Sequence, residues 1–301
     1  VMSGDHIYQM DYSALFNYHS KGGADMTMVV TPVPHESAHR YGIVEMNDCG
    51  KVTRYEEKPE KPFGNLASMT VYLFNTGALV RELRHNAESG KTFQIYDEII
   101  PSMVKRGRVA AYIHKGYWAY SRTLEDYYQS NMDCIGTPPV ANLADWRLHT
   151  NQDADRIGDH PPVLSGSEAS IQNSIVSPGC RIEGKVVNSV LSPMVEVHTG
   201  AEVHDSIILD GTVVEKDTIV NRSIVDKRVH LGASSQIGHS LTECCGAEAN
   251  RHVPTLLDCC LTVIGKKAVI PAGMKIGTNV IIYPEVNESH FTNLEVSHGT
   301  T

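Results

Sequence analysis

The pattern of hydrophobic positions changes character about halfway along the chain. In the first part, compact apolar runs alternate with segments of helical period. Residues 25–33 and 68–76 are rich in apolar, β-branched and aromatic residues, which predicts strands. Residues 11–23, 94–107 and 122–136 have the spacing of helices, the second with a break or kink at its proline. This alternation predicts an α/β domain with a mainly parallel sheet.

Beyond residue 165 the apolar residues follow a beat of six. A period of six fits neither a helix nor a single strand, and it is typical of a solenoid that turns a corner every six residues. We therefore predict a left-handed parallel β-helix over 166–301. The positions on this beat are Ile207, Val213, Ile219, Val225, Leu231, Ile237, Ile264, Ile270, Ile276 and Ile282.

Tripeptides with a central serine recur within the same region. Their spacings are 15 residues once and then 17 residues three times, which is close to three units of six. The serines are Ser174, Ser189, Ser206, Ser223 and Ser240. Small or turn-forming residues are expected to supply the corners, at Pro178, Gly179, Gly200, Gly211 and Gly232.

These patterns divide the chain into three parts. Residues 1–136 form the α/β domain, the proline-containing and weakly periodic stretch 137–165 is a linker, and 166–301 is the solenoid. Residues 242–262 interrupt the beat and are expected to protrude as a loop. That loop either contacts a partner subunit or is a tolerated insertion.

Composition narrows the classes of function. The net charge of −9 argues against a nucleic-acid surface, and no apolar stretch reaches the length of a membrane helix. The odd set of seven cysteines, with no secretion signal, favours reduced thiols and a cytoplasmic location. A zinc site is the alternative interpretation of the adjacent cysteines and nearby histidines. These are Cys244, Cys245, Cys259, Cys260, His239 and His252.

Two short stretches carry candidate chemistry. Asp5 follows Gly4 at the start of the chain, and an acidic residue at the end of a sheet strand can hold Mg²⁺ against phosphate oxygens. In "YEEKPEKP", Glu57 and Lys58 precede Pro59, which biases Lys58 towards an extended backbone. An ammonium and a carboxylate at such a point can bind a sugar phosphate and sugar hydroxyls. A solvated charge run is the alternative for this stretch.

Two further residues could line a sugar pocket. Ser68 lies in the strand-like "LASMTVYLFN", and Trp118 lies just before a predicted helix. Each is equally compatible with an ordinary structural position, the serine within a strand and the tryptophan in the core.

Taken together, "SGDHIY", "MDY", "EEKP" and "LASM" followed by a β-helix resemble the bacterial ADP-glucose pyrophosphorylases of the sugar-nucleotidyltransferase superfamily. The resemblance runs from residue 1 to about residue 285. It implies a partial Rossmann-like nucleotidyltransferase domain that joins ATP and glucose 1-phosphate into ADP-glucose for glycogen-type polymers. It also implies a homo- or hetero-tetramer in which the β-helix mediates subunit contacts.

The resemblance assigns roles residue by residue. Asp5 matches the aspartate that binds Mg²⁺, and Lys58 matches the lysine that binds the sugar phosphate, so both are candidate catalytic residues. Glu57 matches the residue that holds sugar hydroxyls, while Ser68 and Trp118 match positions lining the glucose pocket. For the family's effector site, Arg222 in the repeat region is a weak candidate.

The chain also departs from the family pattern. About a hundred residues precede "GDHIY" in the family, including a glycine-rich loop that cradles the nucleotide, so we expect this chain to be a fragment. Tyr120 stands where the family has a second acidic metal ligand, and a phenol is no substitute for a carboxylate at Mg²⁺. Thr70 replaces a glycine near the pocket, and Asp97 does not match the family's acidic position.

These departures leave alternatives open. One is a catalytically silent regulatory subunit, and another is a nucleotidyltransferase for a different sugar phosphate. A third takes the solenoid as a hexapeptide-repeat acyltransferase with a histidine base, although surface histidines are the better account. The histidines concerned are His198, His204, His230 and His239.

Overall fold

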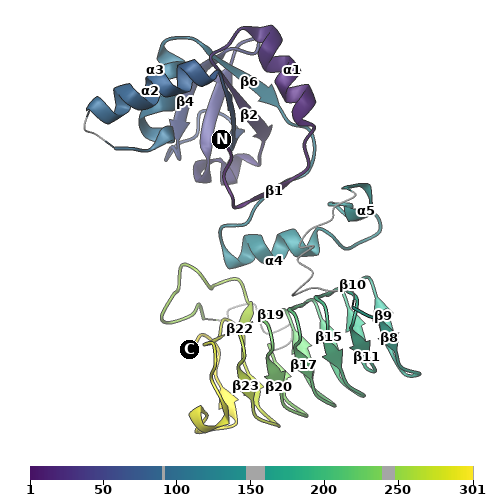
Figure 1. The fold of residues 1–301 in the computed structure, drawn as a ribbon. Coiled ribbons are helices and arrows are strands. Elements are labelled where there is room, and N and C mark those ends of the chain that lie inside the picture. Colours follow the sequence, from purple (N-terminus) through teal and green to yellow (C-terminus); the bar gives the residue numbers. More distant parts are fainter. Residues whose placement is uncertain (90–91, 147–159, 239–247, 301) are drawn as a thin grey trace. The chain divides into compact units, whose positions relative to one another are not determined.

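The computed structural model describes residues 1–89, 92–146, 160–238 and 248–300. Within them the chain forms two compact units, Val1–Ala119 and Tyr120–Thr301 (Figure 1). Helix α4 (Leu124–Met132), which the predicted ranges include in the first domain, lies in the second unit. No helix in the described residues is both long enough and apolar enough to cross a membrane.

The first unit contains one central sheet with helices around it (Figure 1). Its elements are β1 (His6–Tyr8), α1 (Tyr12–Gly22), β2 (Met26–Pro32), η1 (His35–Arg40), β3 (Gly42–Met46), β4 (Val52–Glu57), β5 (Leu66–Phe74), α2 (Thr76–Ser89), the π-helix η2 (Ile95–Ile99), α3 (Ile100–Lys105), β6 (Val109–Ile113) and β7 (Trp118–Tyr120).

The central sheet is mixed, and the prediction of a mainly parallel sheet was wrong in this respect. Its strand order is β4-β3-β5-β2-β6, in which the β2–β6 pair is parallel and the other pairs are antiparallel. For the β3–β4 pair the cause is a tight hairpin, where Gly50 N–H donates to the Asn47 carbonyl. A connection this short can join only antiparallel strands. The α/β class itself is confirmed.

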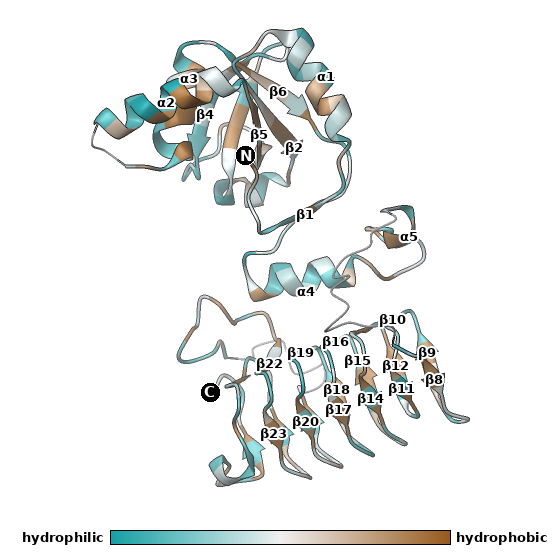
Figure 2. Cartoon of the chain, in the orientation of Figure 1, coloured by the Kyte–Doolittle hydropathy of each residue, from teal (hydrophilic) through white to brown (hydrophobic). Residues whose placement is uncertain are grey.

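The two faces of β2 pack against different elements. Met26, Met28 and Val30 belong to a cluster that includes residues of α2, η2 and α3. Val29 belongs to another cluster with Leu15 of α1. The alternation places β2 between two apolar layers, which explains why its sequence is an almost unbroken apolar run (Figure 2).

Local side chains and turns define the helix ends. Asp11 caps α1 by accepting a hydrogen bond from Ser13 N–H, and Gly23 ends it in the left-handed conformation. Thr123 begins α4 with a capping box. Pro101 lies in the first turn of α3, where a proline is tolerated, so the helical stretch divides just before it, into η2 and α3.

The second unit consists of α4, α5 and a stack of short strands (Figure 1). Its elements are α4 (Leu124–Met132), α5 (Leu143–Trp146), β8 (Leu164–Ser165), β9 (Ser170–Gln172), β10 (Ile175–Val176), β11 (Arg181–Ile182), β12 (Lys185–Val187), β13 (Val190–Leu191), β14 (Glu196–Val197), β15 (Glu202–His204), β16 (Ile207–Ile208), β17 (Val213–Val214), β18 (Ile219–Asn221), β19 (Ser223–Val225), β20 (His230–Leu231), β21 (Gln236–Ile237), β22 (Thr262–Ile264), β23 (Val269–Ile270), β24 (Lys275–Ile276), β25 (Ile281–Ile282), η4 (Glu288–His290) and β26 (Glu295–Val296).

These strands form three parallel sheets of six, six and seven strands, which confirms the parallel β-helix. Ile208 pairs with Val225, Val214 with Leu231, and Val220 with Ile237, so each coil there spans 17 residues. Three steps of six residues make 18, which is one more than the 17-residue coil. The inward-facing position therefore shifts back by one residue in each coil. For this reason the predicted beat was one residue out of place at three of its positions, Ile207, Val213 and Ile219.

The serine tripeptides mark one corner of the solenoid. The residue before each of the first four serines has a positive φ of 39–47°, which Asn and Asp adopt more readily than other non-glycine residues. Each serine hydroxyl then accepts a hydrogen bond from the next serine's N–H, at 3.1 Å in all three cases. The residues with positive φ are Asn173, Asn188, Asp205 and Arg222.

Helix α4 packs on the outside of the solenoid. Tyr128, Ile207, Ile224 and Leu257 share a buried cluster, and the Tyr128 hydroxyl donates to the Asp205 carbonyl at 2.7 Å. Leu257 comes from the predicted protruding loop. That prediction was wrong for this leucine, which is fully buried, because its side chain covers apolar residues of the β16–β19–β22 sheet.

Part of that loop, with Cys244 and Cys245, lies outside the described residues. Cys259 and Cys260 carry thiols rather than a disulfide. In the described part of the chain no three His, Cys, Asp or Glu side chains are grouped so as to hold a metal ion.

The serine ladder makes a testable prediction about stability. Ser206→Ala removes a fully buried hydroxyl that accepts from Ser223 N–H, which should destabilise the solenoid by about 1–3 kcal/mol. Ser174→Ala, at the exposed end of the ladder, should cost less because water replaces its hydroxyl. Hydrogen exchange at the Ser223 and Ser189 amides measures the two losses. Equal destabilisation by the two substitutions would contradict a stabilising role of the buried serine hydroxyls.

Candidate functional site

The five residues predicted to form the site all lie in the first unit. Asp5 precedes β1, Glu57 ends β4, and Lys58 follows it. Ser68 lies in β5 and Trp118 begins β7, which pairs with β1 in a small two-stranded sheet. Four of the five residues therefore lie at or next to strand ends, and Ser68 lies within a central strand.

His6, which sequence reasoning missed, links two of the predicted residues. The Trp118 Nε1–H donates to His6 Nδ1 at 2.9 Å, so in the neutral ring the proton lies on Nε2. That nitrogen lies 2.9 Å from Thr70 Oγ1 and 3.4 Å from Asp5 Oδ1. Burial lowers the pKa of His6, against an opposing effect of the Asp5 charge, and so favours this neutral form. The ring thus orients Asp5 and Trp118 together.

Asp5 keeps an open side. Its side chain is 44% exposed, and it accepts a hydrogen bond from the Ser3 hydroxyl. Mg²⁺ in proteins is commonly held by one or two carboxylates, with water and substrate phosphates completing the shell. The donor chemistry of Asp5 fits such an ion as a single protein ligand. Tyr120, at the position of the expected second acid, instead accepts a hydrogen bond from Arg122 at 3.0 Å.

The carboxylate of Glu57 has a different partner on each oxygen. The Tyr55 hydroxyl donates to Oε2 at 2.6 Å, and Lys58 Nζ lies 3.5 Å from Oε1. Glu57 and Lys58 are 24% and 45% exposed in their side chains. An accessible carboxylate and ammonium therefore lie side by side, as recognition of a sugar phosphate requires.

The backbone is strained at two points next to these residues. Lys58 has φ +46°, so the predicted extended conformation was wrong; its N–H still donates to the Tyr41 carbonyl at 3.1 Å while the chain turns. Thr70 has φ +52° beside an irregularity in the β2–β5 register. Within the described part of the first unit, these are the two non-glycine residues with positive φ. Strain of this kind concentrates at functional sites.

Ser68 and Trp118 are joined to the other residues by contacts. The buried Ser68 hydroxyl lies 3.2 Å from the Tyr72 hydroxyl and accepts from Thr70 N–H at 3.3 Å. The Trp118 ring packs edge-on against Tyr41, with 5.3 Å between ring centroids. Thr70 therefore connects Ser68 to His6, and Tyr41 connects Trp118 to the Lys58 backbone.

The predicted residues thus form two groups joined through intermediates. Asp5 and Trp118 meet at His6, and Glu57 and Lys58 meet each other directly. Tyr55 could have been found from its place two residues before Glu57 on one strand, where alternate residues share a face. His6 directly follows Asp5, but no periodic pattern marks it.

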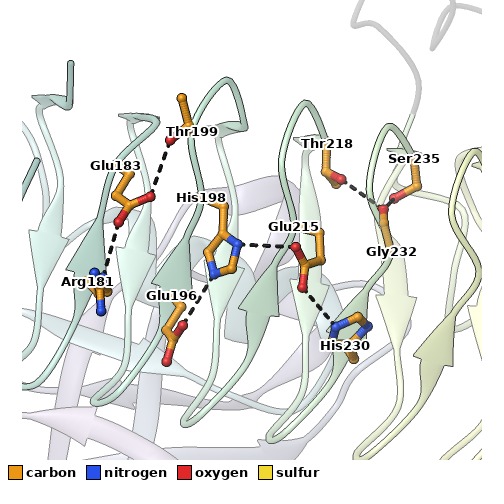
Figure 3. Close-up of polar contacts among 10 residues, drawn as sticks. All are labelled: Arg181, Glu183, Glu196, His198, Thr199, Glu215, Thr218, His230, Gly232 and Ser235. Carbon is orange, nitrogen blue, oxygen red and sulfur yellow. Dashed lines mark hydrogen bonds and ion pairs between the residues drawn. The ribbon is translucent and has the colours of Figure 1, made fainter.

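Arg222 and the solenoid histidines are engaged in the second unit. The Arg222 guanidinium donates to the Cys259 carbonyl at 3.2 and 3.4 Å and lies over the Tyr128 ring. Figure 3 shows His198 between two glutamates, one of which, Glu215, also reaches His230 at 3.1 Å. His204 pairs with Glu202. These pairs favour the interpretation of surface histidines; His239 lies outside the described residues.

Two family models match successive parts of the chain. Residues 1–135 match the family model "Nucleotidyl transferase", and residues 163–246 match "GlmU-like, C-terminal hexapeptide". A glucose-1-phosphate adenylyltransferase of Acetivibrio thermocellus is 39% identical, over 98% of this chain and 68% of the relative. Enzymes of the same name from Thermomicrobium roseum and Ruminiclostridium cellulolyticum are each 37% identical, over 100% and 99% of this chain and 69% of each relative. The chain therefore belongs to the glucose-1-phosphate adenylyltransferase family.

Proposed function

We propose that the protein transfers an adenylyl group from ATP to glucose 1-phosphate and forms ADP-glucose and pyrophosphate. A phosphate oxygen of the sugar attacks the α-phosphorus of ATP, and the bond from that phosphorus to the β-phosphate oxygen breaks. The observation that carries the proposal is the Glu57–Lys58 pair at a strained strand end, in a chain of this family. The product would serve synthesis of a glycogen-type polymer.

Each residue would have its own role, which follows from its charge and shape. Lys58 binds the sugar phosphate and offsets its charge in the transition state, and Glu57 accepts hydrogen bonds from sugar hydroxyls. Ser68 and Trp118 shape the glucose pocket. Asp5 would hold a divalent ion, which we propose is Mg²⁺ and which when bound neutralises charge on the nucleotide phosphates. His6 keeps Asp5 and Trp118 in place.

We also propose a cytoplasmic tetramer of like or related subunits, with the solenoid as the subunit contact. Arg222 is only a weak candidate for an effector contact, because its guanidinium already donates hydrogen bonds to the Cys259 carbonyl. Thr70 and Asp97, which depart from the family pattern, leave room for another sugar phosphate as the acceptor.

A second candidate function is a catalytically silent subunit that assembles with an active relative. Tyr120 favours it, since the phenol bonded to Arg122 supplies no second carboxylate to a metal ion. The accessible Asp5, Glu57 and Lys58 favour catalysis, because a silent site has no need of all three.

Turnover separates the two candidates. The protein, expressed from its complete coding sequence, should release pyrophosphate from ATP and glucose 1-phosphate in the presence of Mg²⁺. A coupled pyrophosphate assay measures it, with each other nucleoside triphosphate and with galactose 1-phosphate as comparisons. Absence of turnover with every pair of substrates, together with co-purification of an active relative, would establish the silent subunit instead.

Lys58→Ala tests the sugar-phosphate contact. Losing a hydrogen bond to a charged phosphate costs about 1.5–3 kcal/mol, so KM for glucose 1-phosphate should rise by roughly 10- to 150-fold. KM for ATP should change by less than about twofold, since uniform loss of one substrate's binding leaves the other's intact. Lys61→Ala, an exposed lysine in the same segment, is the matched control and should change neither. Equal rises in both KM values would remove Lys58 from this role.

A further inference from the structure

We propose that Tyr55 is a positioning residue for sugar recognition, holding one oxygen of Glu57 so that the carboxylate presents a fixed face to the bound sugar. The inference rests on the proposed function, because it takes Glu57 as the residue that accepts hydrogen bonds from sugar hydroxyls. Tyr55 acts through Glu57 and does not itself touch the substrate.

The geometry of β4 brings the two side chains together. Tyr55 and Glu57 are two residues apart on one strand, so they lie on the same face of the sheet. Their 2.6 Å contact has the length of a charge-assisted O–H···O⁻ hydrogen bond. With Oε2 held by the phenol and Oε1 3.5 Å from Lys58 Nζ, rotation of the carboxylate is restricted.

Tyr55 is itself firmly held. Its ring packs in the apolar cluster formed by the sheet with α2, η2 and α3. Burial raises the pKa of Tyr55 well above its ordinary value, and the neighbouring Tyr72, Glu57 and Asp97 raise it further. The phenol therefore stays protonated at neutral pH and donates to Glu57.

Gly42 is a second, independent observation. It is the cross-strand neighbour of Glu57 in β3. A Cβ at Gly42 would lie 2.7 Å from the Tyr55 hydroxyl oxygen and 2.8 Å from Glu57 Oε2. Any other residue there would push the two oxygens apart or aside. The absence of a side chain at Gly42 is thus required by the Tyr55–Glu57 contact.

The contact has a consequence for binding. Without the phenol, both Glu57 oxygens could turn towards Lys58 and form a closer ion pair. That pair would compete with the sugar phosphate for the ammonium and withdraw the acceptor from the sugar hydroxyl. A Glu57 carboxylate that Tyr55 already holds avoids both losses. It also avoids the entropy cost of ordering that carboxylate when the sugar binds.

Tyr55→Phe tests the proposal in the full-length protein. It should raise KM for glucose 1-phosphate about tenfold and leave KM for ATP within about twofold, because only the hydroxyl-to-carboxylate bond is lost. Selectivity for glucose 1-phosphate over its deoxy-sugar analogues should fall in parallel. The matched control is Tyr18→Phe, which removes a hydroxyl that donates to the Ala111 carbonyl in the same unit, and it should leave both KM values unchanged.

Two further variants separate positioning from a general structural effect. Gly42→Ala should reproduce the sugar-specific defect although Tyr55 is intact. In a Glu57→Gln background, adding Tyr55→Phe should change KM for glucose 1-phosphate by less than about twofold, as expected for residues that act as one unit. Unchanged KM values in Tyr55→Phe, equal rises for both substrates, or a full tenfold effect in the Glu57→Gln background would each overturn the proposal.

Calorimetric titration with glucose 1-phosphate gives the same comparison without turnover. A protein that binds this sugar phosphate but forms no ADP-glucose would contradict the proposed reaction and still allow the Tyr55 test. A protein that binds no sugar phosphate at all would overturn both.

Discussion

The left-handed turn at Thr70 is the constraint on which the candidate site depends. It lies in the middle of β5, between β3 and β2, where the register with β2 shifts. The turn places the Thr70 N–H on Ser68 and its hydroxyl on His6, so this residue joins Ser68 to the group formed by Asp5, His6 and Trp118. A β-branched residue in this conformation costs about 1–2 kcal/mol, which the surrounding sheet must offset. The strand is therefore locally less stable than a regular strand, and the same turn fixes the positions of its polar groups.

The solenoid follows a different physical rule. Its coils repeat so closely that each strand pairs with its equivalent in the next coil, and one buried serine ladder continues from coil to coil. Where a coil carries Arg222 in place of the Asn or Asp found at that corner, the side chain instead bonds to Cys259 and covers Tyr128. The departure from the repeat thus secures α4 and the inserted segment to the solenoid wall.

Sequence reasoning predicted what local signals specify. The helices α1 and α4 and the coils of the β-helix depend on residues near one another or on a repeat, and they are confirmed. The antiparallel direction of β3 and β4 depends on their hairpin, and the inward register of the solenoid depends on a 17-residue coil; neither follows from a local period. In the candidate site, the motif pointed to Glu57 and Lys58, and alternation along the strand could have added Tyr55, whereas His6 became visible only through contacts that folding creates.

The central claim is that the Glu57–Lys58 pair receives the sugar phosphate. A crystal structure of the full-length protein with glucose 1-phosphate tests it most directly. The account predicts a phosphate oxygen about 3 Å from Lys58 Nζ and a sugar hydroxyl donating to Glu57 while Tyr55 keeps its bond to Oε2. Glucose 1-phosphate bound away from this pair would contradict the account.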